Sequence, residues 1–180
     1  MKSKSLCIFI SCTIIGCLPK SIILKSSGGG QEAIYNAIID FNATSSLSDN
    51  DSTFSVYLYD VNEDIIGVSI YGTSNKLLIS TEDHINYDYK GLPNQYLELD
   101  GSLFYWDDPN HQLNEEAINI YMKYGLLDTT VMNVYIPSMG VDHSKKSHDY
   151  YFCKKDLLKY KKVKTRIAFG DYEPPKLQCK

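Results

Sequence analysis

The sequence predicts an α+β fold: an antiparallel sheet of about five to seven strands with two main helices packed on it. Three observations lead to this class. Residues 31–42 carry apolar side chains at helical spacing, and residues 53–71 alternate around a polar turn. Residues 96–106 form two short apolar runs joined by Asp100-Gly101. The chain has 180 residues, which is enough for one ordinary domain with its own core.

The first helix is expected over residues 31–42. Its apolar side chains recur at positions i, i+3, i+4 and i+7, which places them on one face. They are Ile34, Ala37, Ile38 and Phe41.

Strands are expected over residues 53–61, 65–71 and 76–81. The first should direct Phe54, Val56 and Leu58 to one face and two tyrosines, Tyr57 and Tyr59, to the other; the second alternates in the same way. Asn62-Glu63-Asp64 makes a hairpin between them. The same segment offers the first three ligands of a calcium loop, but Ile65 and Tyr71 occupy positions that such a loop gives to Gly and Glu, so these are turn residues.

Asp100-Gly101 is a strong signal for a two-residue hairpin turn, because both positions of a type I′ turn need positive φ angles. The resulting register pairs Leu99 with Ser102, Leu97 with Phe104, and Gln95 with Trp106 on one face. Trp106 beside two aspartates suggests a sugar-stacking site. The register instead groups it with apolar side chains, so we expect it in the core.

A second helix should begin after Asn114, its N-cap, with Glu115 and Glu116 in the first turn and Gly125 at its end. Its sheet-facing side chains are expected to be Ala117, Ile118, Tyr121 and Met122. Leu113 and Ile118 are placed to form a hydrophobic staple.

The C-terminal part should add strands at 130–136 and 162–169, with a polar loop at 142–149 between them. In the last strand, Val163 should point inward and Lys162, Lys164 and Arg166 outward. Seven basic residues lie between positions 154 and 166 on an otherwise acidic chain. Lys162, Lys164 and Arg166 are therefore a candidate interaction face for anionic headgroups or an acidic partner. The alternative is a solvated strand face whose charges discourage edge pairing.

The N-terminus is typical of a secretory signal. Lys2 and Lys4 precede an apolar run, residues 6–18, that is too short to span a bilayer as a helix. Ile14-Ile15-Gly16-Cys17 resembles the lipobox of bacterial lipoproteins. The resemblance implies lipid transfer to the Cys17 sulfur, cleavage after Gly16, and acylation of the new amino terminus. The alternative is that Cys7, Cys12 and Cys17 are simply buried in a hydrophobic N-terminal helix.

The resemblance divides the chain into a signal peptide (1–16), a lipidated Cys17 with a flexible tether (17–30), and one domain (31–180). Three acyl chains would hold the protein to a membrane. Leu18, rather than Asp, after the cysteine resembles outer-membrane sorting, so we expect a bacterial envelope protein anchored there and facing the periplasm. A second pattern lies in residues 90–127: Gly91-Leu92-Pro93, Asp100-Gly101, Tyr105-Trp106 and Glu115-Glu116. It resembles uncharacterised small lipoproteins of Bacteroidetes-type bacteria, a likeness that transfers no functional residue.

Two further cysteines, Cys153 and Cys179, suggest one disulfide in an oxidising envelope, with two free thiols as the alternative. Such a bond would close a loop of about 27 residues.

Charge and motifs narrow the function. Loss of Lys2 and Lys4 with the signal leaves 16 basic against 22 acidic residues, a net charge of −6, which gives no reason to expect nucleic acid. The histidines at 143 and 148 lack companions at ligand spacing and are expected to be solvated loop residues, with His84 and His111 isolated; we expect no metal and no cofactor. No motif for nucleophilic catalysis, a zinc protease or a phosphate loop is present.

Three functions therefore remain, in this order. The first is a non-enzymatic envelope lipoprotein that binds a protein or envelope component. The second is a glycan-binding lipoprotein, suggested by the 15 tyrosines, which predicts exposed coplanar rings along a groove. The candidates for those rings are Tyr57, Tyr59, Tyr96 and Tyr105. The third is an enzyme.

Overall fold

The structure is a computed structural model. It describes residues 29–47, 52–73, 76–80, 92–130, 146–164 and 175–179. Cys17 and Arg166 lie outside these ranges, as do most of the residues of the strand expected at 130–136.

The first helix, α1, spans Gly29–Thr44 and confirms the helix expected at 31–42. It begins at Gly29, so the last two residues assigned to the tether are helical instead. Its buried side chains are Ala33, Ile34, Ala37, Ile38 and Phe41, four of them at the predicted positions. A Cβ on Gly30 would stand 2.6 Å from Leu58, so glycine lets the first turn of the helix lie close to the sheet.

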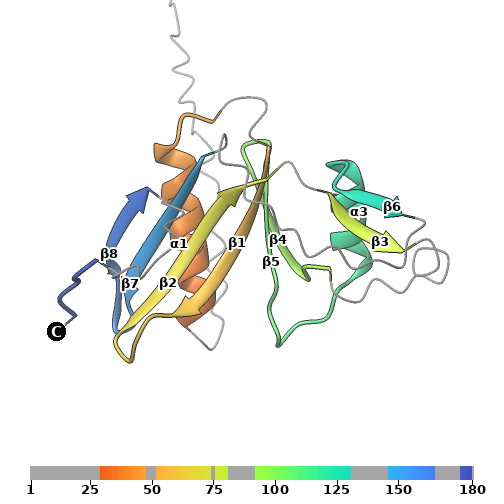
Figure 1. The fold of residues 1–180 in the computed structure, drawn as a ribbon. Coiled ribbons are helices and arrows are strands. Elements are labelled where there is room, and N and C mark those ends of the chain that lie inside the picture. Colours follow the sequence, from red (N-terminus) through yellow and green to blue (C-terminus); the bar gives the residue numbers. More distant parts are fainter. Residues whose placement is uncertain are drawn as a thin grey trace, which may run out of the picture.

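Six strands form the main sheet in the order β4-β5-β1-β2-β7-β8, which confirms the α+β class (Figure 1). Neighbouring strands are antiparallel except for β1 and β5, which run parallel. The strands are β1 (Thr53–Asp60), β2 (Ile65–Gly72), β4 (Gln95–Leu99), β5 (Ser102–Trp106), β7 (Ser147–Cys153) and β8 (Asp156–Lys164).

The hairpin of β4 and β5 has the predicted register, including Leu97 opposite Phe104 and Gln95 opposite Trp106. Asp100 and Gly101 have φ angles of 48° and 80°, as a type I′ turn requires. Trp106 is buried in the core, as expected.

The second described helix, α3, spans Glu115–Lys123. The side chain of Asn114 accepts a hydrogen bond from the Ala117 amide, and Gly125 follows the helix with a φ of 61°, so both predicted ends are confirmed. Ala117 and Tyr121 are buried, as predicted. Met122 was also expected to pack on the sheet, but it is 48% exposed, so that prediction is wrong.

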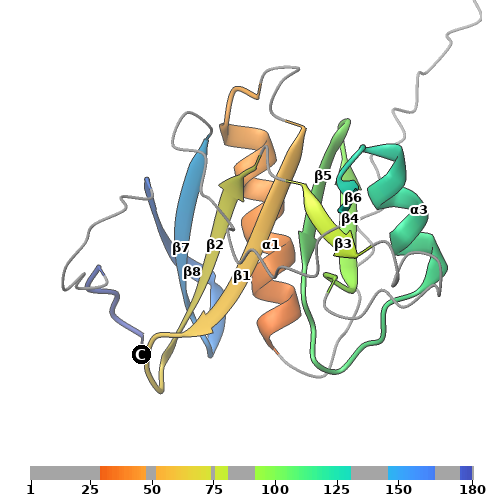
Figure 2. The ribbon, with the colours of Figure 1, turned by 45° about the vertical axis from the view of Figure 1, so that its right-hand side comes forward.

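A separate pair of parallel strands, β3 (Leu77–Ser80) and β6 (Leu127–Thr130), lies beside α3 (Figure 2). The strand expected at 76–81 is therefore present. The two strands meet where the Leu77 amide donates to the Leu126 carbonyl at 2.7 Å.

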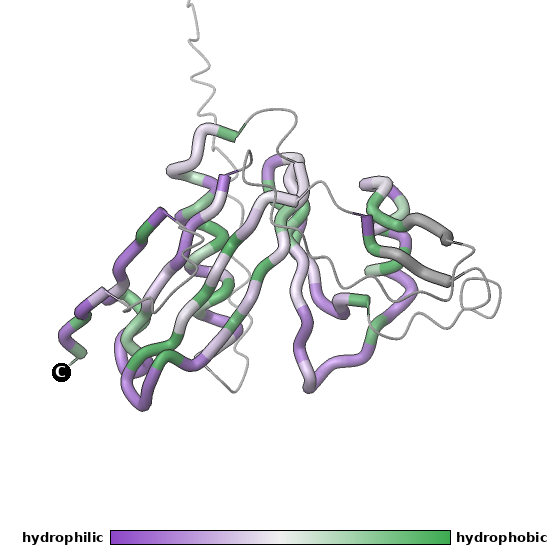
Figure 3. The backbone as a smooth tube through the Cα atoms, in the orientation of Figure 1, coloured by the Kyte–Doolittle hydropathy of each residue, from purple (hydrophilic) through white to green (hydrophobic). Residues whose placement is uncertain are grey.

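The two helices cover opposite faces of the main sheet. Across β1, β2, β7 and β8, one face packs on α1 in a core that includes Phe41, Phe54, Tyr150 and Phe152. On β5, the opposite face packs on α3 through Leu103 and Tyr105. In Figure 2, α1 lies behind the central strands and α3 lies to the right of β4 and β5. Hydrophilic residues gather at the turn between β1 and β2 and after β5 (Figure 3).

Two predictions for the C-terminal part are wrong. Of the polar loop expected at 142–149, residues 147–149 belong to β7, a strand that was not expected, and residues 142–145 lie outside the described chain. The last strand, expected at 162–169, is β8 and begins at Asp156; residues 165–169 lie outside the described chain.

Candidate functional site

The predicted disulfide is present. Cys153, at the end of β7, is bonded to Cys179 in the C-terminal tail, with Cα atoms 5.4 Å apart. Cys153 is buried, so the bond holds the tail against the end of the sheet. The tail and the turn between β1 and β2 together line a shallow depression; its residues are Asn62, Glu63, Asp64, Ile65, Leu177, Gln178 and Cys179.

The basic face expected on the last strand has a different orientation. Lys162 is paired with Tyr150 across β7 and β8, and Tyr150 lies in the core beneath α1. Lys162 therefore points toward the helix, and its ammonium lies 3.0 Å from the Asp40 carboxylate. Lys164, two residues on, is exposed on the same side, whereas Val163, expected inward, lies on the opposite side. Lys162 is thus a structural ion-pair partner instead of part of a free basic surface.

The Asp40 carboxylate, on α1, accepts hydrogen bonds from side chains of β7 and β8. The Tyr150 and Tyr160 hydroxyls donate to its carboxylate at 2.9 and 2.8 Å. Burial alone would raise the pKa of this carboxyl, but the hydrogen bonds from Lys162, Tyr160 and Tyr150, with the Lys162 charge, lower it below its usual value. The bond to Asp40 and burial in turn raise the pKa of Tyr160. The arrangement fastens the helix to the edge of the sheet.

His148 lies beside this cluster and is not a solvated loop residue. It belongs to β7, is half-buried, and contacts the Phe41 ring edge-on at 5.5 Å between centroids. Burial lowers the pKa of His148, and the nearby charges of Lys162, Lys164 and Lys146 act in the same direction. The imidazole is therefore neutral at physiological pH and functions here as a packing residue.

A second polar cluster surrounds Asp108, in the segment after β5. Its buried carboxylate accepts hydrogen bonds from the Gln31 side chain at 2.5 Å and from the Asn110 amide at 2.9 Å. His111 was expected to be isolated, yet its Nδ1 lies 2.7 Å from the same carboxylate. Asn94 completes the cluster by binding the Asp108 backbone at both N–H and C=O.

This second cluster is organised to hold a loop. Burial would raise the pKa of the Asp108 carboxyl, but the bonds from Asn110 and His111 lower it below its usual value. A buried carboxylate that orients a half-exposed histidine is also part of many catalytic sites. Among the described residues, no serine, threonine or cysteine side chain is hydrogen-bonded to the His111 ring, which is paired with Asp108. The Gln31 bond instead ties the start of α1 to the loop.

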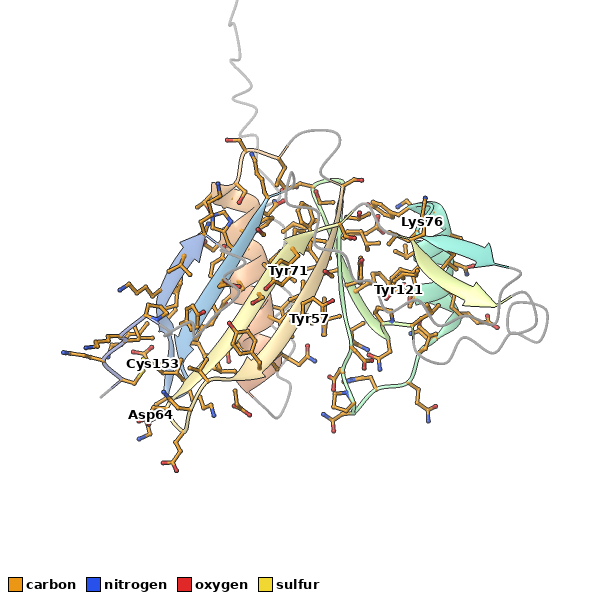
Figure 4. The ribbon with its side chains drawn as sticks, viewed as in Figure 1. Tyr57, Asp64, Tyr71, Lys76, Tyr121 and Cys153 are labelled. Atoms are coloured by element: carbon orange, nitrogen blue, oxygen red, sulfur yellow. A yellow bond between two sulfur atoms is a disulfide. The ribbon has the colours of Figure 1, made fainter. Side chains whose placement is uncertain are left out.

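The third feature is the face of β1, β2 and β7 that points away from α1, which we call the tyrosine face. Strand register places its residues together, since directly paired residues share a side. Its residues are Thr53, Ser55, Tyr57, Tyr59, Ile65, Gly67, Ser69, Tyr71, Ser147, Asp149, Tyr151 and Cys153. Tyr59 is its exposed tyrosine, Tyr57 and Tyr71 are half-buried, and Tyr151 is buried. Figure 4 shows Tyr57 and Tyr71 projecting from this side of β1 and β2. Within the described ranges, no helix packs on it.

Tyr59 lies flat on the tyrosine face, over Gly67 of the neighbouring strand. Three atoms of its ring lie within 3.0 Å of the place where a Cβ on Gly67 would stand. A ring standing on its edge brings only two atoms so close, so the ring lies nearly parallel to the sheet. Tyr59 is 37% exposed. Glycine therefore seats the ring, and the outer ring surface faces away from the sheet.

Tyr57 and Tyr71 form an edge-to-face pair next to it, with centroids 5.8 Å apart and planes at 65°. Burial raises the pKa of both hydroxyls, which also form hydrogen bonds with Ser55 and Ser69, respectively. Ser69 in turn donates to the buried Asp149 carboxylate at 2.5 Å. The face therefore combines uncharged phenol rings with hydroxyl groups.

Only two of the four tyrosines proposed for a glycan groove lie there. Tyr105 points to the same side of the sheet but is buried against Tyr121 of α3, at 6.0 Å between centroids. Tyr96 packs on the same cluster, where burial and a hydrogen bond to Glu116 raise its pKa to about 12. Two members were missed. The register of a hairpin around Asn62-Glu63-Asp64 would have placed Tyr71 next to Tyr57, whereas Tyr151 lies on β7, a strand that was not expected.

Among the described residues, no three His, Cys, Asp or Glu side chains come together in a way that would hold a metal ion. Nor does any helix in the described chain have the length and apolar character needed to cross a membrane.

The comparisons with known proteins give no relative from which a function could be transferred. No family model, no curated protein sequence and no solved structure matches this chain.

Proposed function

We propose that this chain is a lipid-anchored protein of the bacterial cell envelope, and that its domain is a non-enzymatic binding module. The lipobox-like Ile14-Ile15-Gly16-Cys17 supports the anchor, with Cys17 as the lipidated residue. The disulfide between Cys153 and Cys179 supports an oxidising compartment. The proposed site of attachment is the outer membrane, with the domain in the periplasm.

The observation that carries the binding role is the difference between the two sides of the sheet. The Asp40 and Asp108 clusters join elements of the fold. The tyrosine face joins no described helix to the sheet, yet it gathers aromatic rings that are enriched in binding surfaces. We therefore assign the contact with an envelope component to the tyrosine face.

Mass spectrometry of the mature N-terminus tests the anchor. The expected product begins at Cys17 and carries the mass of acyl chains, and Cys17→Ser should move the protein from the membrane to the soluble fraction. An unmodified Cys17, or membrane retention of Cys17→Ser, would contradict the proposal.

Photocrosslinking in living cells tests the binding surface. A photoreactive amino acid is placed at Tyr59 or, as the matched control, at Leu58, its neighbour on the opposite side of β1. The two positions have similar exposure, 37% and 42%. Adducts from position 59 that are missing from position 58 are expected. Equal labelling from both positions, or none from position 59, would contradict this surface.

A further inference from the structure

We propose that the tyrosine face binds a neutral glycan and that the outer surface of the Tyr59 ring is the platform on which a sugar ring stacks. This inference rests on the proposed function, because it names the class of ligand that the same surface accepts.

The orientation of Tyr59 is the first argument. A pyranose presents weakly positive C–H groups on its flat side, and these pack against the negative face of an aromatic ring. That contact needs a ring whose face, and not its edge, is turned outward. Gly67 provides this orientation because it lacks the Cβ that would collide with three ring atoms of Tyr59.

The polar groups around the platform are the second argument. Tyr57 lies two residues from Tyr59 on the same side of β1, and the Tyr71 ring contacts the Tyr57 ring. A phenol hydroxyl can donate one hydrogen bond and accept others, so it can bind a sugar hydroxyl in addition to its own serine partner. Ligand sites of this kind use an apolar surface for affinity and a few polar groups for orientation.

Charge favours a neutral ligand. At the positions of β1, β2 and β7 that share this side, the one ionisable acid is Asp149, which is buried and bonded to Ser69, and there is no lysine or arginine. An anionic polysaccharide or a phosphate-bearing headgroup would find no cation at these positions. Lys161 of the edge strand β8, which is paired with Tyr151 of β7, lies at the edge of the tyrosine face.

The distribution of exposed aliphatic side chains argues against a protein partner. The centre of a protein interface is usually apolar. At the positions of β1, β2 and β7 on this side, no exposed aliphatic side chain is present. Leu58 points to the α1 side of β1, Ile39 and Met122 are on the helices, and Leu158 is on the edge strand β8. A ring flanked by hydroxyl groups suits a sugar better than an apolar protein surface.

Affinity electrophoresis tests the inference. The mature lipidated protein, in a non-ionic detergent without a sugar headgroup, is run through native gels that contain a β-glucan, a mannan, a xylan or a galactan. A parallel gel contains polygalacturonate as the anionic probe. We expect at least one neutral polysaccharide to retard the protein, and polygalacturonate to retard it less.

Four variants identify the surface. Tyr59→Ala is expected to weaken the retardation at least tenfold and Gly67→Ala to weaken it through displacement of the ring. Tyr59→Phe keeps the ring and should stay within about twofold of the parent, and Leu58→Ala, on the opposite side of the strand, should match it. Thermal unfolding of each variant verifies that it is folded. If Tyr59→Ala does not fold, the loss of retardation expected for Gly67→Ala, compared with Tyr59→Phe and Leu58→Ala, tests the same surface.

Absence of retardation by all four neutral polysaccharides would overturn the inference. So would retardation that Tyr59→Ala leaves unchanged, or retardation by polygalacturonate alone. These failures are distinguishable from failure of the proposed function. If position 59 crosslinks a protein in cells and no polysaccharide retards the chain, the glycan is wrong and the binding surface stands.

Discussion

The two sides of β1, β2 and β7 differ in chemistry although they are built from the same strands. On the α1 side, Phe54 stacks on Phe104 at 4.9 Å between centroids and Phe41 meets Phe54 edge-on at 5.1 Å. On the tyrosine face, rings carry hydroxyl groups and alternate with serine and glycine. Since successive residues of a strand point to opposite sides, one sequence specifies both surfaces. The first side holds the fold together, and we assign binding to the second.

The strongest way to break this comparison is to remove a ring from each side. Phe41→Ala should lower the free energy of unfolding by about 3–5 kcal/mol, because it leaves a cavity in a closed core. Tyr59→Ala, which removes a ring that is 37% exposed, should cost less than about 1 kcal/mol. Urea denaturation of both variants measures the two effects. Similar losses would mean that the tyrosine face is also part of the core.

Removal of the disulfide between Cys153 and Cys179 tests how much stability the C-terminal tail contributes, apart from the two sides of the sheet. Cys179→Ser frees the tail and should lower the free energy of unfolding by about 3–4 kcal/mol, the loop-closure entropy of some 27 residues. Polysaccharide retardation should not change in the folded variant, because the bond lies at the end of β7. Denaturation under non-reducing conditions measures the first effect. A loss below about 1 kcal/mol would show that the tail contributes little.

The Asp40 cluster makes the stability of the contact between α1 and the sheet depend on pH. Asp40→Asn should cost about 2 kcal/mol at pH 7, the scale of charge-assisted hydrogen bonds. Because the folded-state pKa of Asp40 is lowered, the stabilisation is complete above its ordinary value near 3.8 and is lost as the pH falls through the lower folded value. The difference between parent and variant should therefore shrink below about pH 4. Stability curves at several pH values measure it, and a constant difference would contradict the assignment.

The smallest expected effect on stability is that of Gly67→Ala. Reduced entropy of the unfolded chain favours alanine by about 0.4–1 kcal/mol, and displacement of the Tyr59 ring opposes this gain. We expect a net change within about 1 kcal/mol, together with shifted NMR resonances of the Tyr59 ring. Unchanged ring resonances would show that the ring does not rest on Gly67.

Local signals made much of the fold predictable. The β4–β5 register follows from Asp100-Gly101, and the ends of α3 follow from Asn114 and Gly125, because turns and caps depend on a few adjacent residues. The parallel pairing of β1 with β5 joins segments about fifty residues apart, and no local pattern indicates it. The strand β7 was missed because Tyr150-Tyr151-Phe152-Cys153 is buried on both sides and shows no alternation.

The candidate site was less predictable than the fold. The alternation around Val163 has the predicted period, but the two faces of the strand were exchanged: Lys162 faces α1 and Val163 faces away from it. No local pattern indicates that Lys162 pairs with Asp40, which is more than a hundred residues away in α1. The pairing of His111 with Asp108 was missed even though the two are three residues apart, since only the folded loop directs both side chains together. Tyr57 and Tyr59 were placed correctly on one side, and the hairpin register adds Tyr71.

Tyrosine footprinting tests the central claim most directly, because Tyr59 and Tyr160 are exposed to a similar extent, 37% and 41%, on opposite sides of the sheet. Each is nitrated in whole cells and in the purified protein, and the extent of modification is compared by mass spectrometry. The account predicts that Tyr59 is protected in cells and that Tyr160 is modified equally in both settings. Protection of Tyr160 with Tyr59 unprotected would contradict it.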